Sequence, residues 1–274
     1  MKDKLFVLSI AAWLLAGCAS EYNQVFKTED YAYKYEYAKE CFALGKYNRA
    51  ASILTDVVTF MKGTTNAQES LFMLAMAQYN DRDYENASQT FRRYFASYPK
   101  GQFTEASKFY VGQSLFMNTP EPRLDQSETL AAITAFQEYL DLYPDAAMKD
   151  AAHDRLYELQ DKLVKKELHN AQLYFDLGSY FGNCLEGGNN YEACIITAQN
   201  ALKDYPFTNL REEFAVLIMK SKFELAQQSI EEKRLERYQD AEDECYGFIN
   251  EFPDSKDRAV AEKYIEKCKA VTKG

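Results

Sequence analysis

The stretch YENASQTFRRYFASYP, residues 84–99, carries the pattern that decides the fold. Ala87, Phe91 and Tyr94 are spaced by four and three residues, so they lie on one face of a helix. Pro99 then ends this helix, because proline lacks an N–H group and its ring clashes with the preceding turn. The stretch therefore predicts an amphipathic helix whose apolar face contains one small residue, Ala87.

The same pattern recurs along the chain. Further copies end at Pro144, Pro206 and Pro253, and an earlier copy has Lys62 in the place of proline. Each of the first four copies can be paired with a small residue upstream: Ala38 with Ala50, Ala75 with Ala87, Gly112 with Ala132, and Gly178 with Cys194. For the last copy Ser221 is one candidate. Small residues at these positions allow two antiparallel helices to approach closely.

Paired helices of this kind predict a solenoid. Residues 174–181 resemble the first half of the tetratricopeptide repeat, and residues 87–99 resemble its second half. Because one hairpin cannot cover its own apolar face, neighbouring hairpins stack. We expect an all-α tetratricopeptide-repeat solenoid of about five helix hairpins with a C-terminal capping helix. Repeats one to three are expected at 30–148, and repeats four and five with the capping helix (257–271) at 149–274.

Three segments depart from the regular spacing. Residues 118–123, which contain two prolines, predict a loop. Residues 149–170 form a charged run with leucines on one face, which predicts a single long helix leading into the fourth repeat. Residues 229–237 are expected to extend another helix.

The N-terminus has the features of an export signal. A short basic start precedes an apolar run at 5–15, which is too short to span a bilayer. Leu-Ala-Gly-Cys at 15–18 follows directly and resembles the lipobox of bacterial lipoproteins. This resemblance implies a lipoprotein signal peptide at 1–17, diacylglycerol on the Cys18 thiol and a lipidated tail at 18–29. An ordinary signal peptide followed by a chance cysteine is the alternative.

The residues after Cys18 bear on the final location of the protein. Ala19 and Ser20 follow without the aspartate that retains enterobacterial lipoproteins in the inner membrane, and without the acidic run that sends some lipoproteins to the cell surface. Several acyl chains on Cys18 would anchor the chain stably in a lipid bilayer. We therefore expect a lipid-anchored protein on the periplasmic face of the outer membrane.

Composition and motifs argue against catalysis and against nucleic-acid binding. The formal net charge is −10, and an acidic surface repels phosphate backbones. The histidines, His153 and His169, are expected at surface positions on helices. The sequence has no metal-ligand, phosphate-loop or nucleophile motif, so we expect no catalytic residue, no metal site and no cofactor.

The cysteines beyond Cys18 allow two interpretations. Cys194 and Cys245 occupy buried repeat positions, where cysteine serves as a small hydrophobic residue. In an oxidising compartment, Cys184 with Cys194, or Cys245 with Cys268, is an alternative disulfide pair.

Aromatic residues recur at fixed offsets from the small residues of the first three repeats. Three residues before each small residue lie Tyr35, Phe72 and Phe109. Four residues after each small residue lie Phe42, Tyr79 and Phe116. One interpretation is an aromatic groove that binds an extended peptide, since rings supply contact area at low entropy cost. The other is that these rings pack on neighbouring helices or on the N-terminal tail at 22–26.

A lipobox followed by about five such repeats, with the phrases YPKG at 98–101 and FPDS at 252–255, resembles the BamD family of outer-membrane protein assembly lipoproteins. The resemblance covers essentially the whole mature chain. It implies N-terminal repeats that receive C-terminal signals of unfolded outer-membrane proteins. It also implies C-terminal repeats that hold the periplasmic domains of a BamA-type barrel subunit.

Two other functions stay open. An envelope repeat protein that coordinates peptidoglycan enzymes would be recognised by murein synthases or hydrolases among its partners. A nutrient-binding lipoprotein of the SusD type ranks last, because that family is much larger and carries long loop insertions.

Overall fold

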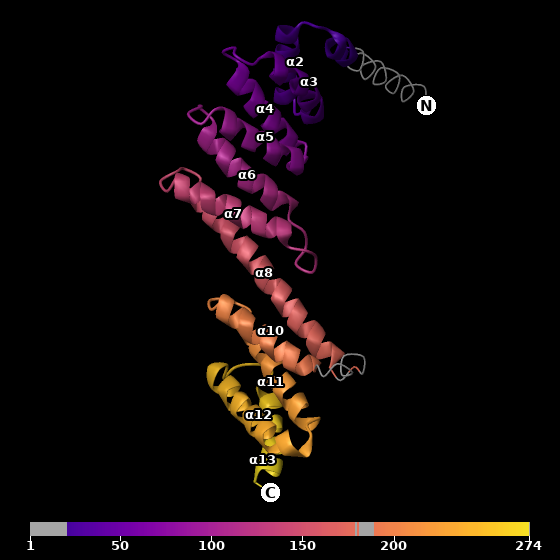
Figure 1. Ribbon diagram of the computed structural model, residues 1–274, viewed down its shortest axis with the longest axis vertical. Coiled ribbons are helices and arrows are strands. Elements are labelled where there is room, and N and C mark those ends of the chain that lie inside the picture. Colours follow the sequence, from indigo (N-terminus) through magenta and orange to yellow (C-terminus); the bar gives the residue numbers. More distant parts are fainter. Residues whose placement is uncertain (1–20, 179, 181–188, 274) are drawn as a thin grey trace, which may run out of the picture. The chain divides into compact units, whose positions relative to one another are not determined.

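The computed structural model describes residues 21–178, 180 and 189–273, and all regular elements in these ranges are helices (Figure 1). The chain forms two compact units. The first comprises residues up to Pro120 together with Gln126–Leu159, and the second comprises Glu121–Asp125 and the residues from Gln160 onward. The division therefore falls inside one long helix, α8 (Lys149–Leu177).

The first unit is a stack of helix hairpins, with each helix packed on the next. Its helices are α2 (Tyr31–Ala43), α3 (Tyr47–Phe60), α4 (Ala67–Asn80), α5 (Tyr84–Ser97), α6 (Thr104–Asn118) and α7 (Ser127–Leu142), followed by the start of α8. The paired small residues are all buried: Ala38 and Ala50, Ala75 and Ala87, and Gly112 and Ala132. The loop expected at 118–123 lies between α6 and α7.

The second unit continues the same architecture. The remainder of α8 is followed by α10 (Asn190–Asp204), α11 (Arg211–Gln227), α12 (Glu231–Glu251) and α13 (Arg258–Thr272). The consecutive helices from α10 to α13 pack on one another, and Ser221 is fully buried on α11. The long helix expected at 149–170 and the terminal helix are confirmed. Of the extension expected at 229–237, residues 231–237 form the start of α12, and residues 229 and 230 lie outside the helix. The predicted all-α solenoid of helix hairpins is likewise confirmed.

One local prediction is wrong. Gly178 does not lie within a helix beside Cys194, but just beyond the end of α8 with a φ of +49°. A side chain disfavours this left-handed conformation, and a Cβ added to Gly178 would lie 2.7 Å from the Tyr191 hydroxyl oxygen. Asn190 donates a side-chain hydrogen bond of 3.0 Å to the Gly178 carbonyl oxygen. Gly178 therefore ends α8.

The proline pattern produces one repeated helix ending. The helices α5, α7, α10 and α12 each end two residues before a proline. Their C-cap residues have almost the same backbone angles, with φ between −126° and −134° and ψ of 66° or 67°. A following proline excludes the helical conformation at this position. In α3, where Lys62 replaces proline, the C-cap Met61 stays helical with a ψ of −3°.

The buried side chain of Tyr94 connects neighbouring hairpins through hydrogen bonds. The Tyr94 hydroxyl on α5 donates a hydrogen bond of 3.2 Å to Gln68 Oε1 on α4 and accepts one of 3.2 Å from the Phe103 backbone N–H, just before α6. Gly101 leaves room for this arrangement, since a Cβ there would lie 2.7 Å from both the Tyr94 hydroxyl oxygen and Gln68 Oε1. Tyr139 holds the equivalent position in the next repeat, and burial raises its pKa to about 12.

The close approach of α6 and α7 yields a stability prediction. A Cβ added to Gly112 would lie 2.9 Å from Cδ1 of the buried Phe136 ring. We expect Gly112→Ala to destabilise the protein by about 1–3 kcal/mol, because the two helices must separate. Gly247→Ala is the matched control, since Gly247 is exposed on α12 and a Cβ there has no neighbour within 4 Å.

The control substitution should stabilise the protein by about 0.5–1 kcal/mol through helix propensity. Urea unfolding followed by circular dichroism measures both changes. If Gly112→Ala and Gly247→Ala changed the free energy of unfolding equally, the close contact between Gly112 and Phe136 would not be the cause.

Candidate functional site

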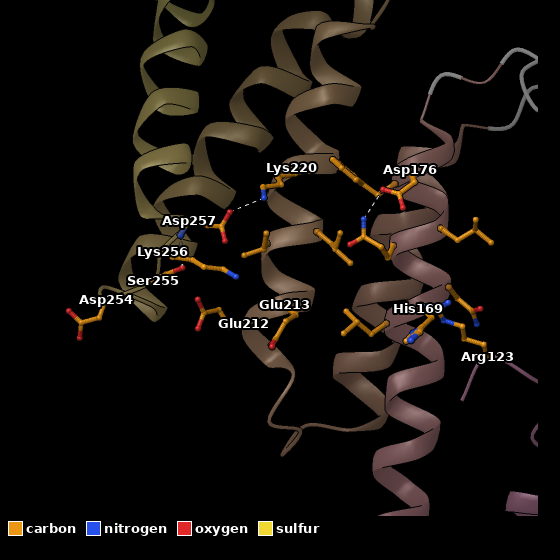
Figure 2. A pocket seen from close by; sticks show the side chains of 17 residues that line it. Arg123, His169, Asp176, Glu212, Glu213, Lys220, Asp254, Ser255, Lys256 and Asp257 are labelled. Carbon is orange, nitrogen blue, oxygen red and sulfur yellow. Dashed lines mark hydrogen bonds and ion pairs between the residues drawn. The ribbon is translucent and has the colours of Figure 1, made fainter. Parts of the chain in front are cut away.

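The second unit contains a groove of about 1020 Å³, which we call the C-terminal groove. It is bounded by the C-terminal half of α8, the N-terminal half of α11 and the loop that joins α12 to α13. Arg123, from the loop between α6 and α7, lies beside His169 of α8 (Figure 2). This loop is fastened to α8 by a hydrogen bond of 3.1 Å from Lys166 Nζ to the Leu124 carbonyl oxygen.

Apolar side chains line the groove on both α8 and α11. They are Leu168, Leu173, Phe175, Val216 and Leu217. Leu168, Phe175 and Leu217 also belong to the core between α8, α10 and α11, so they are held in place from behind. Leu173 is 56% exposed and offers its side chain to a ligand. The groove therefore combines a fixed apolar surface with at least one unburied anchor point.

Charged side chains accompany the apolar surface. The acidic residues are Asp176, Glu212, Glu213, Asp254 and Asp257, and the basic residues are Arg123, Lys220 and Lys256. Glu212 and Glu213 lie in the first turn of α11, where the helix dipole favours carboxylates. A groove that mixes an apolar surface with charged groups suits an extended polypeptide better than a small metabolite.

The α12–α13 loop is fixed to α11 by an ion pair. Lys220 Nζ donates a hydrogen bond of 2.8 Å to Asp257 Oδ1, and the Asp257 carboxylate is largely buried (Figure 2). The Asp257 backbone N–H in turn donates to Ser255 Oγ at 3.1 Å. These contacts hold this side of the groove in a defined shape.

The six aromatic residues predicted to form a groove all lie in the first unit. Tyr35 and Phe109 are buried in its core, whereas Phe42, Phe72, Tyr79 and Phe116 are half-buried. Phe72 stacks on Phe103 with ring centroids 4.4 Å apart, and the Tyr79 and Tyr110 centroids lie 5.3 Å apart. The Phe42 ring meets Tyr47, and the Arg155 guanidinium lies 4.7 Å from the Phe116 ring centroid. These rings therefore pack on neighbouring residues, and their role in peptide binding stays a prediction.

The offsets that selected these six residues also apply to the C-terminal groove once the repeat register is corrected. Ala171 of α8 is fully buried and takes the place that the sequence pattern gave to Gly178. The residue three before it is Leu168 and the residue four after it is Phe175, and both line the groove. They also pack against the core, so packing on a neighbouring helix and lining a groove are compatible roles. Ala171 is therefore the small residue from which the sequence offsets lead to the groove-lining Leu168 and Phe175.

The described residues contain little that suggests covalent chemistry. His153 is exposed, and His169 is half-buried in the wall of the C-terminal groove. Over the described ranges, no group of three or more His, Cys, Asp or Glu side chains is arranged to hold a metal ion.

Cys41, Cys194, Cys245 and Cys268 are free and buried, whereas Cys184 lies outside the described residues. Burial raises the pKa of Cys245 to about 12 and that of Cys268 to about 11, which keeps both thiols protonated at neutral pH. The described cysteines thus behave as core residues.

Cys18 and the signal segment before it also lie outside the described residues. Within residues 21–178, 180 and 189–273, no helix combines the length and the apolar character needed to cross a bilayer.

Among solved structures, the chain is similar to two forms of the nearly identical TPR-like repeats of a putative kinesin light chain from Podosopora anserina. One form, a glutamine-to-methionine variant, has a TM-score of 0.34 at 14% identity and covers 88% of this chain and 93% of that one. The second form has a TM-score of 0.33 at 14% identity, with 89% and 97% covered. No curated protein sequence matches the chain.

The family model YfiO, described as an outer membrane lipoprotein, matches residues 28–227. The match begins just before α2 and ends with α11, so it takes in all of the hairpins of the first unit and both helices that line the C-terminal groove. The chain therefore belongs to the YfiO family of outer membrane lipoproteins, which is the BamD family.

Proposed function

We propose that this protein is a lipid-anchored, non-enzymatic scaffold subunit of the outer-membrane β-barrel assembly machine. It binds segments of unfolded outer-membrane proteins and a BamA-type barrel subunit from the periplasmic face of the membrane. The observation that carries the proposal is membership of the BamD family across residues 28–227. A solenoid of helix hairpins with a preformed groove supports it.

The C-terminal groove supplies a physical basis for binding an extended segment. Leu173 and its apolar neighbours provide contact area for alternate side chains of a peptide, and the charged groups beside them restrict its orientation. The partly exposed aromatic rings of the first unit, such as Phe42 and Phe116, offer a second surface of this kind. Binding a substrate and the barrel subunit on one chain raises the effective concentration of each for the other.

The partners are tested by site-specific crosslinking in cells. A photoreactive amino acid in place of Leu173 should crosslink an unfolded outer-membrane protein or the barrel subunit, because this side chain projects into the C-terminal groove. The matched control replaces Leu235, which is similarly exposed on α12 but does not line the groove. Mass spectrometry of the purified adducts identifies the partners.

We expect adducts at position 173 that are absent at 235. Murein synthases or hydrolases as the main adducts would instead support the peptidoglycan-enzyme alternative. Absence of any barrel subunit from crosslinked membranes would argue against the assembly-machine proposal.

The anchor is tested by Cys18→Ser. The substitution removes the thiol that would carry diacylglycerol, so the protein should lose its palmitate label and move from the membrane to the soluble fraction. Ala19→Ser, which leaves the thiol in place, should stay in the membrane fraction with its label. Undiminished membrane association of Cys18→Ser would contradict anchoring through this residue.

A further inference from the structure

Four aromatic rings form a connected cluster at the N-terminal end of the first unit. Tyr22 and Phe26 lie on the helical segment 21–27, with ring centroids 5.9 Å apart. Tyr31, the first residue of α2, stacks on Phe60, the last residue of α3, at 3.6 Å. Lys34 joins the two pairs, since its Nζ lies 5.7 Å from the Phe26 centroid and 5.2 Å from the Tyr31 centroid. We call these four rings the aromatic patch.

The aromatic patch covers buried groups but keeps an exposed outer surface. Beneath it, Val25 is buried and the Lys34 ammonium is buried against Asp56 Oδ2 at 3.4 Å. Phe26 nevertheless remains 43% exposed and Phe60 58% exposed. Both rings are too large and too apolar to be exposed without cost. Contacts within the first unit therefore leave a substantial aromatic surface for an external environment.

The position of the patch along the chain identifies that environment. Under the proposed function, Cys18 carries the lipid and is the first residue of the mature chain. The three Cα–Cα steps from Cys18 to Glu21 span at most about 11 Å in a fully extended chain. The acyl chains lie inside the bilayer, so the helical segment that begins at residue 21 is confined to the membrane surface. Tyr22 is only four residues from the anchor.

The chemistry of the patch fits the region between the headgroups and the acyl chains. Aromatic side chains concentrate at this interface, where an apolar ring and a polar hydroxyl are both accommodated. The charged residues that adjoin the patch in sequence or contact it, with the Lys34 partner Asp56, are of both signs in equal number. They are Glu21, Glu29, Asp30 and Asp56, and Lys27, Lys34, Arg49 and Lys62. Without a cationic surplus, attraction to anionic lipid does not drive the contact.

We propose that the aromatic patch docks into the interfacial region of the phospholipid bilayer beside the lipid anchor. The acyl chains hold the protein at the membrane, and the rings of Phe26 and Phe60 fix which surface of the first unit faces it. The inference rests on the proposed lipidation of Cys18.

Tryptophan fluorescence tests this docking directly. The only tryptophan, Trp13, lies in the signal peptide, so the mature chain has none and Phe60→Trp creates a single reporter. The lipidated protein is reconstituted into vesicles of phosphatidylethanolamine and phosphatidylglycerol that also contain acyl-brominated phosphatidylcholine. The matched reporter is Phe207→Trp, because Phe207 is 97% exposed in the second unit.

We expect the emission of Phe60→Trp to shift to shorter wavelength and to lose intensity to the brominated lipid. Phe207→Trp should keep the emission of a water-exposed indole and be quenched by aqueous iodide. The shift of Phe60→Trp should persist in vesicles without phosphatidylglycerol. Phe26→Trp provides an independent reporter if circular dichroism shows that Phe60→Trp is misfolded.

Co-sedimentation with the vesicles separates the two proposals. Membrane-bound protein whose Phe60→Trp and Phe26→Trp emission is unshifted and unquenched would overturn the docking alone. A shift that needs phosphatidylglycerol would assign the contact to charge and also overturn it. Purified protein that does not co-sediment would overturn lipid anchoring, and the docking with it.

Discussion

Close contact between antiparallel helices at a small residue is the constraint on which the fold depends. At Gly112 there is no room for even one additional methyl group beside Phe136, and the paired alanines of the first two hairpins are fully buried. Such contacts bring the larger side chains a turn away into mutual contact. The aromatic rings at those positions then pack between hairpins, and the same geometry leaves part of their surface accessible.

Four of the helix endings share one backbone geometry. A proline two residues after the last helical residue prevents the C-cap from staying helical, and four C-caps adopt nearly identical angles as a result. Because these effects are local, they could be predicted from sequence: the long helix α8, the loop between α6 and α7 and the terminal helix α13 all lie where spacing and proline placed them. The boundary between the two units could not, since it depends on tertiary contacts within a continuous helix.

The sites were less predictable than the helices. The residues around Gly178 match the repeat pattern, but Gly178 itself ends α8 in a left-handed backbone conformation. The small residue on the buried face of α8 is Ala171 instead. A shift of seven residues, close to two helical turns, preserves the face and therefore hides the error. The sequence offsets selected six aromatic residues in the first unit, and their role in peptide binding stays a prediction. The C-terminal groove was missed, because its walls are mostly leucine, valine and charged residues brought together from four separate segments.

The burial of the cysteines has a consequence for how the protein survives its route to the membrane. Exported chains pass through an oxidising compartment, where exchange with other disulfides requires a thiolate. Burial raises the pKa of Cys245, so its thiol stays protonated at neutral pH, and the neighbouring helices shield it from attack. Once α12 and α13 have packed, Cys245 and Cys268 are buried and their raised pKa values disfavour the thiolate that exchange requires. The thiols are therefore exposed to exchange mainly before the helices pack, and burial in the folded state protects them without any dedicated chemistry.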